Sequence, residues 1–317
     1  MVDPNPERMS VRSTEYLESM LDEYNGKVNS LIGGDAAELM EACMNRGCIL
    51  VMLGHQTSAM DDFETVLELA ETMESEGRRP EGDTVFKALT TMGLALYAEG
   101  QEFLPALEAA SAMVPSLGRN VGHFDRRSLT RTCLDCADAL MDEGSYEHAA
   151  GFLRRVLEDT DGSMDRWSRN KHAEAMLMTA ECGEMSGRES VAASVYTDTI
   201  AECKALMMDE SLDNMDTVIN AFMGRALCHN AMGDREAYVE DLMSGAEAIR
   251  AVHEAGGTYD RDTEAEVNNL IARELASMGR DAEAERYMLR SMTIGLEASA
   301  ELNKTDFGDD DGDEGWE

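Results

Sequence analysis

The chain has 317 residues, of which 43% are hydrophobic and 29% charged, and its formal net charge is −37. This balance is typical of a soluble globular protein and not of a disordered one. The acidity argues against nucleic acid and anionic membranes as direct partners, because both require a concentrated basic surface. Few prolines and aromatic residues, with many methionines, alanines, leucines and glutamates, favour an all-α protein.

The cysteines and the apolar runs indicate where such a protein resides. The seven cysteines are an odd number, and most lie in segments with helical periodicity. Free thiols in a reducing cytoplasm fit this pattern better than the disulfide framework of a small secreted domain. Residues 1–10 lack the apolar core of a signal peptide, and no apolar run has the length of a membrane span. We therefore expect a soluble cytoplasmic protein.

The two ends of the chain differ from the rest. Residues 1–10 are expected to form a disordered tail, and residues 11–31 carry apolar side chains at helical spacing until "IGGD" ends the pattern. Such a helix would cap the first unit of a repeat array. Residues 304–317 include "DFGDDDGDEGWE" and are expected to form an acidic, disordered tail.

Between these ends, one pattern occurs six times around a glycine. The glycines are Gly54, Gly100, Gly144, Gly187, Gly233 and Gly279. A small residue precedes each by seven positions: Gly47, Gly93, Ala137, Ala180, Ala226 and Ala272. An alanine follows five positions after most of them, and Pro105 and Tyr238 take its place in two repeats. The spacing predicts six helical hairpins.

Each part of the pattern has a role in a hairpin of antiparallel helices. The small residue lets the two helices approach closely, and the glycine supplies the left-handed conformation that ends the first helix. The alanine gives a second close contact, and the residue four positions later lies one turn along the same face. A single hairpin cannot cover its own apolar face, so neighbouring hairpins must stack on it.

The segments "GSYEHAAGFL", "GCILVMLGHQTSAMDDF" and "SMGRDAEAERYM" resemble the second-helix signature of the tetratricopeptide repeat family. The six matches cover roughly residues 36–300. Successive glycines are 43 to 46 residues apart, as from Gly144 to Gly187 and from Gly187 to Gly233, whereas the family's repeat has about 34 residues. The resemblance implies an all-α solenoid of six hairpins over residues 11–303, wound as a right-handed superhelix with longer helices than usual.

The resemblance also implies that the first helix of each hairpin lines a concave surface that binds a partner protein or peptide. The candidates on this surface are Met44, Cys48, Lys87, Thr90, Leu94, Tyr97, Arg131, Leu134, Asp138, Leu177, Glu181, Met223, Leu227, Asn230, Asn269 and Arg273. About half of them are expected to be exposed, while the others pack between hairpins. The lysines and asparagines that clamp acidic peptide ends in some relatives are absent in their usual order, so that function is not carried over.

One stretch differs in charge from the rest of the chain. Between Arg119 and Lys171 basic and acidic residues nearly balance. Ion pairs along helix faces would explain this, and we favour that interpretation. The alternative is a patch formed by Arg126, Arg127, Arg154 and Arg155 that receives an acidic segment, with the chain's own residues 304–317 as one occupant.

No phosphate-binding glycine loop, His-Glu-x-x-His pair or Gly-x-Ser-x-Gly elbow is present, and we expect no enzymatic activity, cofactor or metal. Cys133 and Cys136 share a helix face and leave a thiol- or metal-dependent enzyme as a third hypothesis, although packing explains them better.

The sequence favours an interaction scaffold or adaptor. The alternative is a peptide-sensing receptor or a chaperone-like protein whose groove is gated by the acidic tail. The oligomeric state stays open.

Overall fold

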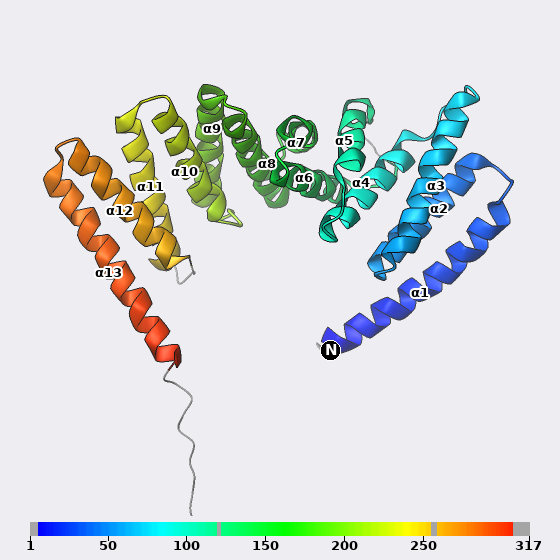
Figure 1. Ribbon diagram of the computed structural model, residues 1–317, viewed down its shortest axis with the longest axis horizontal. Coiled ribbons are helices and arrows are strands. Elements are labelled where there is room, and N and C mark those ends of the chain that lie inside the picture. Colours follow the sequence, from blue (N-terminus) through cyan, green and yellow to red (C-terminus); the bar gives the residue numbers. More distant parts are fainter. Residues whose placement is uncertain (1–5, 119–121, 255–258, 307–317) are drawn as a thin grey trace, which may run out of the picture. The chain divides into compact units, whose positions relative to one another are not determined.

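The computed structural model describes residues 6–118, 122–254 and 259–306, and helices dominate this part of the chain (Figure 1). The chain divides into two compact units, unit 1 over residues 1–161 and unit 2 over residues 162–317. Unit 1 holds α1 (Pro6–Leu31), α2 (Ala36–Met52), α3 (Gln56–Ser75), α4 (Gly82–Ala98), α5 (Leu104–Met113), the 3-10 helix η1 (Val114–Ser116), α6 (Arg126–Asp142) and α7 (Tyr146–Thr160). Unit 2 holds α8 (Arg166–Met185), α9 (Glu189–Met208), α10 (Asp216–Ala231), α11 (Arg235–Glu254), α12 (Arg261–Ser277) and α13 (Asp281–Asp306).

The boundary between the units interrupts what the sequence predicted as one array over residues 11–303. It falls in the segment "DTDGSMD", between the third and the fourth hairpin. After the buried Thr160, which ends α7, the chain turns at Gly162 with a positive φ of 65°, and Met164 is 92% exposed. None of the helices in the described ranges combines the length and the apolar character of a membrane-spanning segment.

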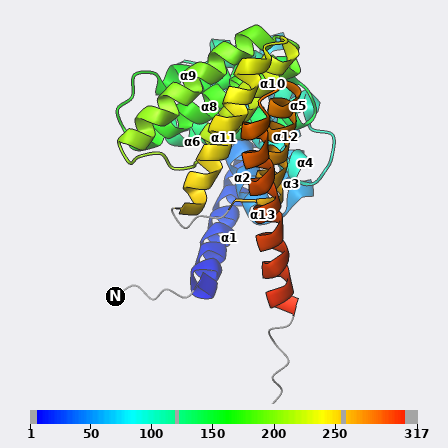
Figure 2. The same ribbon diagram turned by 90° about the vertical axis from the view of Figure 1, so that its left-hand side faces the viewer.

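All six predicted hairpins are confirmed: α2/α3, α4/α5, α6/α7, α8/α9, α10/α11 and α12/α13. The six turn glycines adopt the left-handed conformation, with φ values between 64° and 80°, in which a side chain would be strained. The first helices have 16 to 20 residues, which accounts for the long repeat. In Figures 1 and 2, α13 runs beside α12 and extends beyond it, as its 26 residues against 17 require.

The small residue that precedes each turn glycine by seven positions is buried in every hairpin. At Gly47 the second helix comes so close that an added Cβ would lie 2.7 Å from Cε1 of Phe63, whose ring is fully buried. At Gly93 an added Cβ would overlap the buried side chain of Leu107. The size of this residue therefore sets how closely the two helices of a hairpin approach.

The second hairpin departs from the predicted register. In the other five hairpins the second helix begins two residues after the glycine, whereas α5 begins at Leu104, four residues after Gly100. The predicted contact residues Pro105 and Ala109 are exposed, and Ala106, Leu107 and Ala110 are buried in their place. The alignment on Gly100 was wrong here, because Pro105 lacks a backbone N–H and belongs in the first turn of a helix.

Both ends of the array differ from the predicted boundaries. The first helix begins at Pro6, so residues 6–10 are helical and the predicted tail over 1–10 was too long. Proline at the first helical position explains this start, since its fixed φ suits a helix and its missing N–H costs no hydrogen bond there. The last helix runs to Asp306, beyond the predicted end at 303. The remaining parts of the predicted tails, 1–5 and 307–317, lie outside the described residues.

Aspartates begin four of the first helices. The side chains of Asp35, Asp125, Asp165 and Asp260 accept backbone N–H groups at the starts of α2, α6, α8 and α12. The backbone N–H of Ser128 lowers the pKa of the Asp125 carboxyl, and the hydroxyl of Thr263, together with its backbone N–H, lowers the pKa of the Asp260 carboxyl. Part of the chain's negative charge thus stabilises helix termini.

Two hairpins share a buried ion pair that the sequence analysis missed. In the first hairpin, Arg46 donates from Nε and Nη2 to the carboxylate of Asp62, at 2.8 and 2.6 Å. In the fifth hairpin, Arg225 binds Asp241 in the same way, at 2.9 and 2.6 Å. Both arginines lie eight residues before the turn glycine and both aspartates eight after it. A search for an arginine and an aspartate sixteen residues apart could have found the pair.

The close approach at Gly47 predicts a stability difference between two glycine-to-alanine variants. Gly26 also lies within a helix, but an added Cβ there would have no heavy atom within 4 Å. Both variants gain the helix propensity of alanine, whereas only Gly47→Ala overpacks a core. We expect Gly47→Ala to be less stable than Gly26→Ala by about 1–3 kcal/mol in urea unfolding followed by circular dichroism. Equal stability of the two variants would contradict the tight contact with Phe63.

Candidate functional site

The first helices expose a regular row of side chains, which we call the first-helix row. It consists of the residues six and thirteen positions before each turn glycine, and none of these twelve residues is buried. In unit 1 the row is Glu41, Cys48, Lys87, Leu94, Arg131 and Asp138. In unit 2 it is Glu174, Glu181, Asn220, Leu227, Glu266 and Arg273. Positions seven residues apart lie on nearly the same side of a helix, so each pair forms one stripe.

Eight of these residues were predicted from the sequence, and four were missed. The missed residues, Glu41, Glu174, Asn220 and Glu266, all occupy the position thirteen residues before the glycine. A step of two helical turns back from the predicted residues would have identified them.

The candidates ten positions before the glycine are mostly buried, which corrects their assignment to a binding surface. Met44, Thr90, Leu134 and Leu177 are all less than 10% exposed. They lie three residues before the small residue of the hairpin, so they share its face of the helix and are packed in the core with it. The equivalent positions in the last two hairpins are more open, because Met223 is half-buried and Asn269 is exposed.

In unit 1, two predicted binding residues also hold neighbouring parts of the chain. Lys87 donates to the carbonyl of His123 at 3.5 Å, and its Nζ lies 5.6 Å from the ring centre of Phe124. The hydroxyl of Tyr97 donates to the carboxylate of Asp142. Lys87 thereby fixes the segment before α6, and Tyr97 fixes the end of α6, so both are half-buried structural residues. In unit 2 the further candidate Asn230 is exposed near the end of α10.

The arginine patch predicted in unit 1 is incomplete. Arg126, Arg127 and Arg154 are exposed, but Arg155 is only 6% exposed. Arg155 donates from Nε to Asp159 at 2.7 Å and from Nη2 to the carbonyl of Gly118 at 2.8 Å. It therefore holds a loop against α7 and is not available to an acidic segment.

The cysteines lie in the core. Cys133 and Cys136 are fully buried, and burial raises the pKa of Cys133 to about 12 and the pKa of Cys136 well above the usual thiol value. Both thiols are therefore protonated at neutral pH and lack the nucleophilic thiolate. Among the described residues there is no group of three or more histidine, cysteine, aspartate or glutamate side chains placed to hold a metal.

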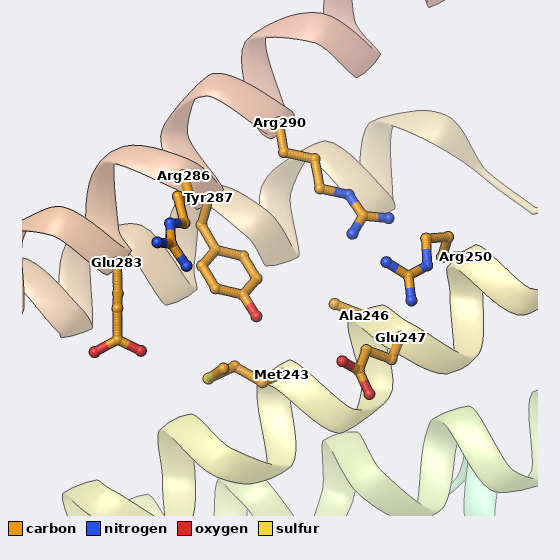
Figure 3. Close-up of a pocket in the computed structure, with 8 residues that line it drawn as sticks. All are labelled: Met243, Ala246, Glu247, Arg250, Glu283, Arg286, Tyr287 and Arg290. Carbon is orange, nitrogen blue, oxygen red and sulfur yellow. The ribbon is translucent and has the colours of Figure 1, made fainter.

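A pocket of about 250 Å³ lies in unit 2 between the second helices α11 and α13. Arg250 comes from α11, and Arg286, Tyr287 and Arg290 come from α13 (Figure 3). Figure 3 shows the guanidinium groups of Arg250 and Arg290 and the Tyr287 hydroxyl directed into the same gap. Burial, with a smaller contribution from the Glu247 carboxylate, raises the pKa of Tyr287, so its hydroxyl stays protonated and can donate a hydrogen bond.

Two arginines of this pocket differ in their ion pairs: Arg290 is paired with a residue of α12, whereas among the described residues Arg286 is not. Arg290 donates to Glu264 of α12 at 3.1 Å, and the same buried carboxylate lies 3.1 Å from Nδ1 of His253. Arg286 is exposed and makes no ion pair within the described ranges. Sequence reasoning missed this pocket, since α12 separates Arg250 from Arg286 along the chain.

Comparisons with known proteins agree with this architecture. The tetratricopeptide repeat model matches residues 41–73, which include most of the first hairpin. The structure is similar to the apo form of RapI, with a TM-score of 0.55 and 10% sequence identity over 89% of this chain and 77% of that one. The fold is tetratricopeptide-like. A comparison with curated protein sequences finds no match.

Two further solved structures show weaker similarity. BtubC from P. vanneervenii has a TM-score of 0.49 and 14% identity, over 89% of this chain and 92% of that one. A tetratricopeptide repeat protein from Parabacteroides merdae has a TM-score of 0.31 and 16% identity, over 82% and 79% of the two chains. The tetratricopeptide-like assignment therefore depends on the family match, the RapI structure and the six hairpins themselves.

The burial of the thiols predicts slow chemical modification of the native protein. We expect iodoacetamide at neutral pH to alkylate Cys133 and Cys136 far more slowly than the half-buried Cys48, because they are inaccessible and protonated. Mass spectrometry of peptides from native and urea-unfolded samples measures this, and all seven cysteines should react after unfolding. Rapid alkylation of Cys133 or Cys136 in the native protein would instead indicate an accessible thiol site.

Proposed function

We propose that this protein is a non-enzymatic interaction scaffold that binds a partner protein or peptide through its first-helix row. The observation that supports this most is that the row stays outside the core: six of its twelve residues are exposed and six are half-buried, although the residues around them fill the core. Packing alone does not require a repeated open stripe on every hairpin. Stripes of this kind are the usual binding surfaces of helical repeat arrays.

The chemistry of the row in unit 2 favours a basic and apolar partner segment. Three of its six residues are glutamates, Arg273 is the one cation among these six, and Glu174 is partly neutralised by Lys171 at 2.5 Å. Leu227 is 52% exposed in the middle helix of these three and offers an apolar contact. The net charge of −37 would speed the approach of a basic partner by long-range attraction.

The row in unit 1 has a more balanced charge. Glu41 and Asp138 are acidic, Lys87 and Arg131 are basic, and Leu94 is half-buried. Such a surface suits a partner with both signs of charge, so the two units are proposed to bind different segments. Mixed polar and apolar contacts of this kind favour specificity over a single broad hydrophobic patch.

A scaffold without catalysis is also supported by the thiols and the fold. The hypothesis of a thiol enzyme depended on Cys133 and Cys136, which are buried and protonated. The seven cysteines are all unpaired, in keeping with the reducing cytoplasm in which we place the protein.

Substitution of Leu227 tests this function. With the full chain as bait in an extract of its own cells, Leu227→Asp should remove captured proteins that the parent chain retains. Once a captured partner is purified, its affinity should fall about fivefold or more, because the loss of a buried apolar contact at an interface costs more than about 1 kcal/mol.

The matched control is Val191→Asp on the second helix α9. Val191 is 57% exposed, close to the value for Leu227, so the two variants place the same charge at equally open apolar sites. The control should retain the partner. If Val191→Asp loses it and Leu227→Asp retains it, or if both variants capture the same proteins as the parent, the first-helix row is not the binding surface.

A further inference from the structure

The pocket between α11 and α13 concentrates positive charge in a chain with few cations. The whole sequence has 27 lysines and arginines against 64 aspartates and glutamates. Three of these arginines, Arg250, Arg286 and Arg290, nevertheless line one pocket of about 250 Å³. Because both lining helices are second helices, the pocket does not involve the first-helix row.

The lining holds three arginines against two glutamates, Glu247 and Glu283, and Arg290 is paired with Glu264 of α12. Glu283 is held from outside the pocket by Arg280, which donates to both carboxylate oxygens at 2.8 and 2.9 Å. Within the described part of the chain, Arg250 forms a solvent-exposed ion pair of 3.4 Å with Glu254, a pair that contributes little. Glu247 is the remaining acidic residue of the lining. The guanidinium groups of Arg250 and Arg286 can therefore bind another carboxylate, because their planar donors match the two oxygens of a carboxylate.

We propose that this pocket binds an acidic peptide segment and that its occupant is the chain's own segment 307–317. The segment carries six carboxylate side chains and no basic residue. Its Trp316 lies ten residues after Asp306 and suits the apolar part of the lining, which includes Met243 and Tyr287. An indole can also stack on a guanidinium group, which adds a cation–π contact.

The length of the segment allows it to reach the pocket. Asp306 ends α13 sixteen residues after Arg290, a distance of about 24 Å along a helix. The eleven residues that follow span up to about 36 Å when extended. A segment that turns back along α13 therefore reaches Arg290 and Arg286.

Attachment to the same chain favours this occupant over a separate acidic peptide. A free acidic peptide is repelled by a protein with a net charge of −37. The tethered segment has an effective concentration on the order of millimolar, as expected for a short flexible connection. A site with modest affinity is then occupied by the segment itself.

Fluorescence of Trp316 tests the proposal in the full chain. Trp167 is the other tryptophan, so Trp167→Phe leaves Trp316 as the sole reporter. We expect its anisotropy to exceed that of a synthetic peptide of residues 304–317. Adding Arg250→Glu and Arg286→Glu should lower it to the value of the free peptide. Arg290 is left intact, because it also holds Glu264 of α12.

A charge-matched control locates the site. Arg126→Glu with Arg154→Glu changes two exposed arginines of unit 1, and the anisotropy of Trp316 should stay at the value of the parent. A third variant changes Asp313, Glu314 and Glu317, the acidic residues far enough from Asp306 to reach the pocket, to asparagine. It leaves the described helices untouched and should release Trp316, so the proposal can be tested even if the arginine variant fails to fold.

Three results would overturn the proposal. The first is a parent anisotropy equal to that of the free peptide. The second is an anisotropy that persists in the asparagine variant or in a folded pocket variant. The third is release of Trp316 by the control pair instead of the pocket pair, which would place the segment on unit 1. Because none of these readouts involves a partner, they are independent of the test of the first-helix row.

Discussion

The close approach of two helices at one small residue is the constraint on which the rest of the structure depends. In every hairpin the residue seven positions before the turn glycine is buried, and at Gly47 the ring of Phe63 occupies the space of a missing side chain. This contact fixes the rotation of the first helix about its axis. The rotation in turn keeps the residues six and thirteen positions before the glycine outside the core, where they are exposed or half-buried.

The acidic side chains of this protein have two kinds of role: some stabilise the fold, and others belong to the proposed binding surface. Some carboxylates begin helices, as Asp125 and Asp260 do, and others are buried with an arginine, as Asp62 and Asp241 are. Glutamates of the first-helix row remain open to solvent or are half-buried. Among the arginines, Arg46 and Arg225 complete these pairs, and Arg250, Arg286 and Arg290 line the pocket between α11 and α13. The two proposed binding surfaces thus differ in charge, since the first-helix row of unit 2 is rich in glutamates and the pocket is rich in arginines, and they lie on different helices.

The sequence predicted the hairpins well because glycine and alanine have local, steric reasons to occupy their positions. It failed where a tertiary contact overrides the repeat. Pro105 shifted α5 by two residues, and the residues ten positions before the glycine, such as Leu134, were drawn into the core by their neighbours. The arginine pocket was beyond a reading of local pattern, since Arg250 and Arg290 meet only through the packing of three successive helices.

The central claim is that the first-helix row contacts the partner, and photo-crosslinking tests it most directly. Benzoylphenylalanine is placed at position 227 of α10 in one sample and at position 191 of α9 in another, in the full chain inside its own cells. The account predicts a crosslinked partner from position 227 and none from position 191. A partner crosslinked from position 191 and not from position 227 would contradict it.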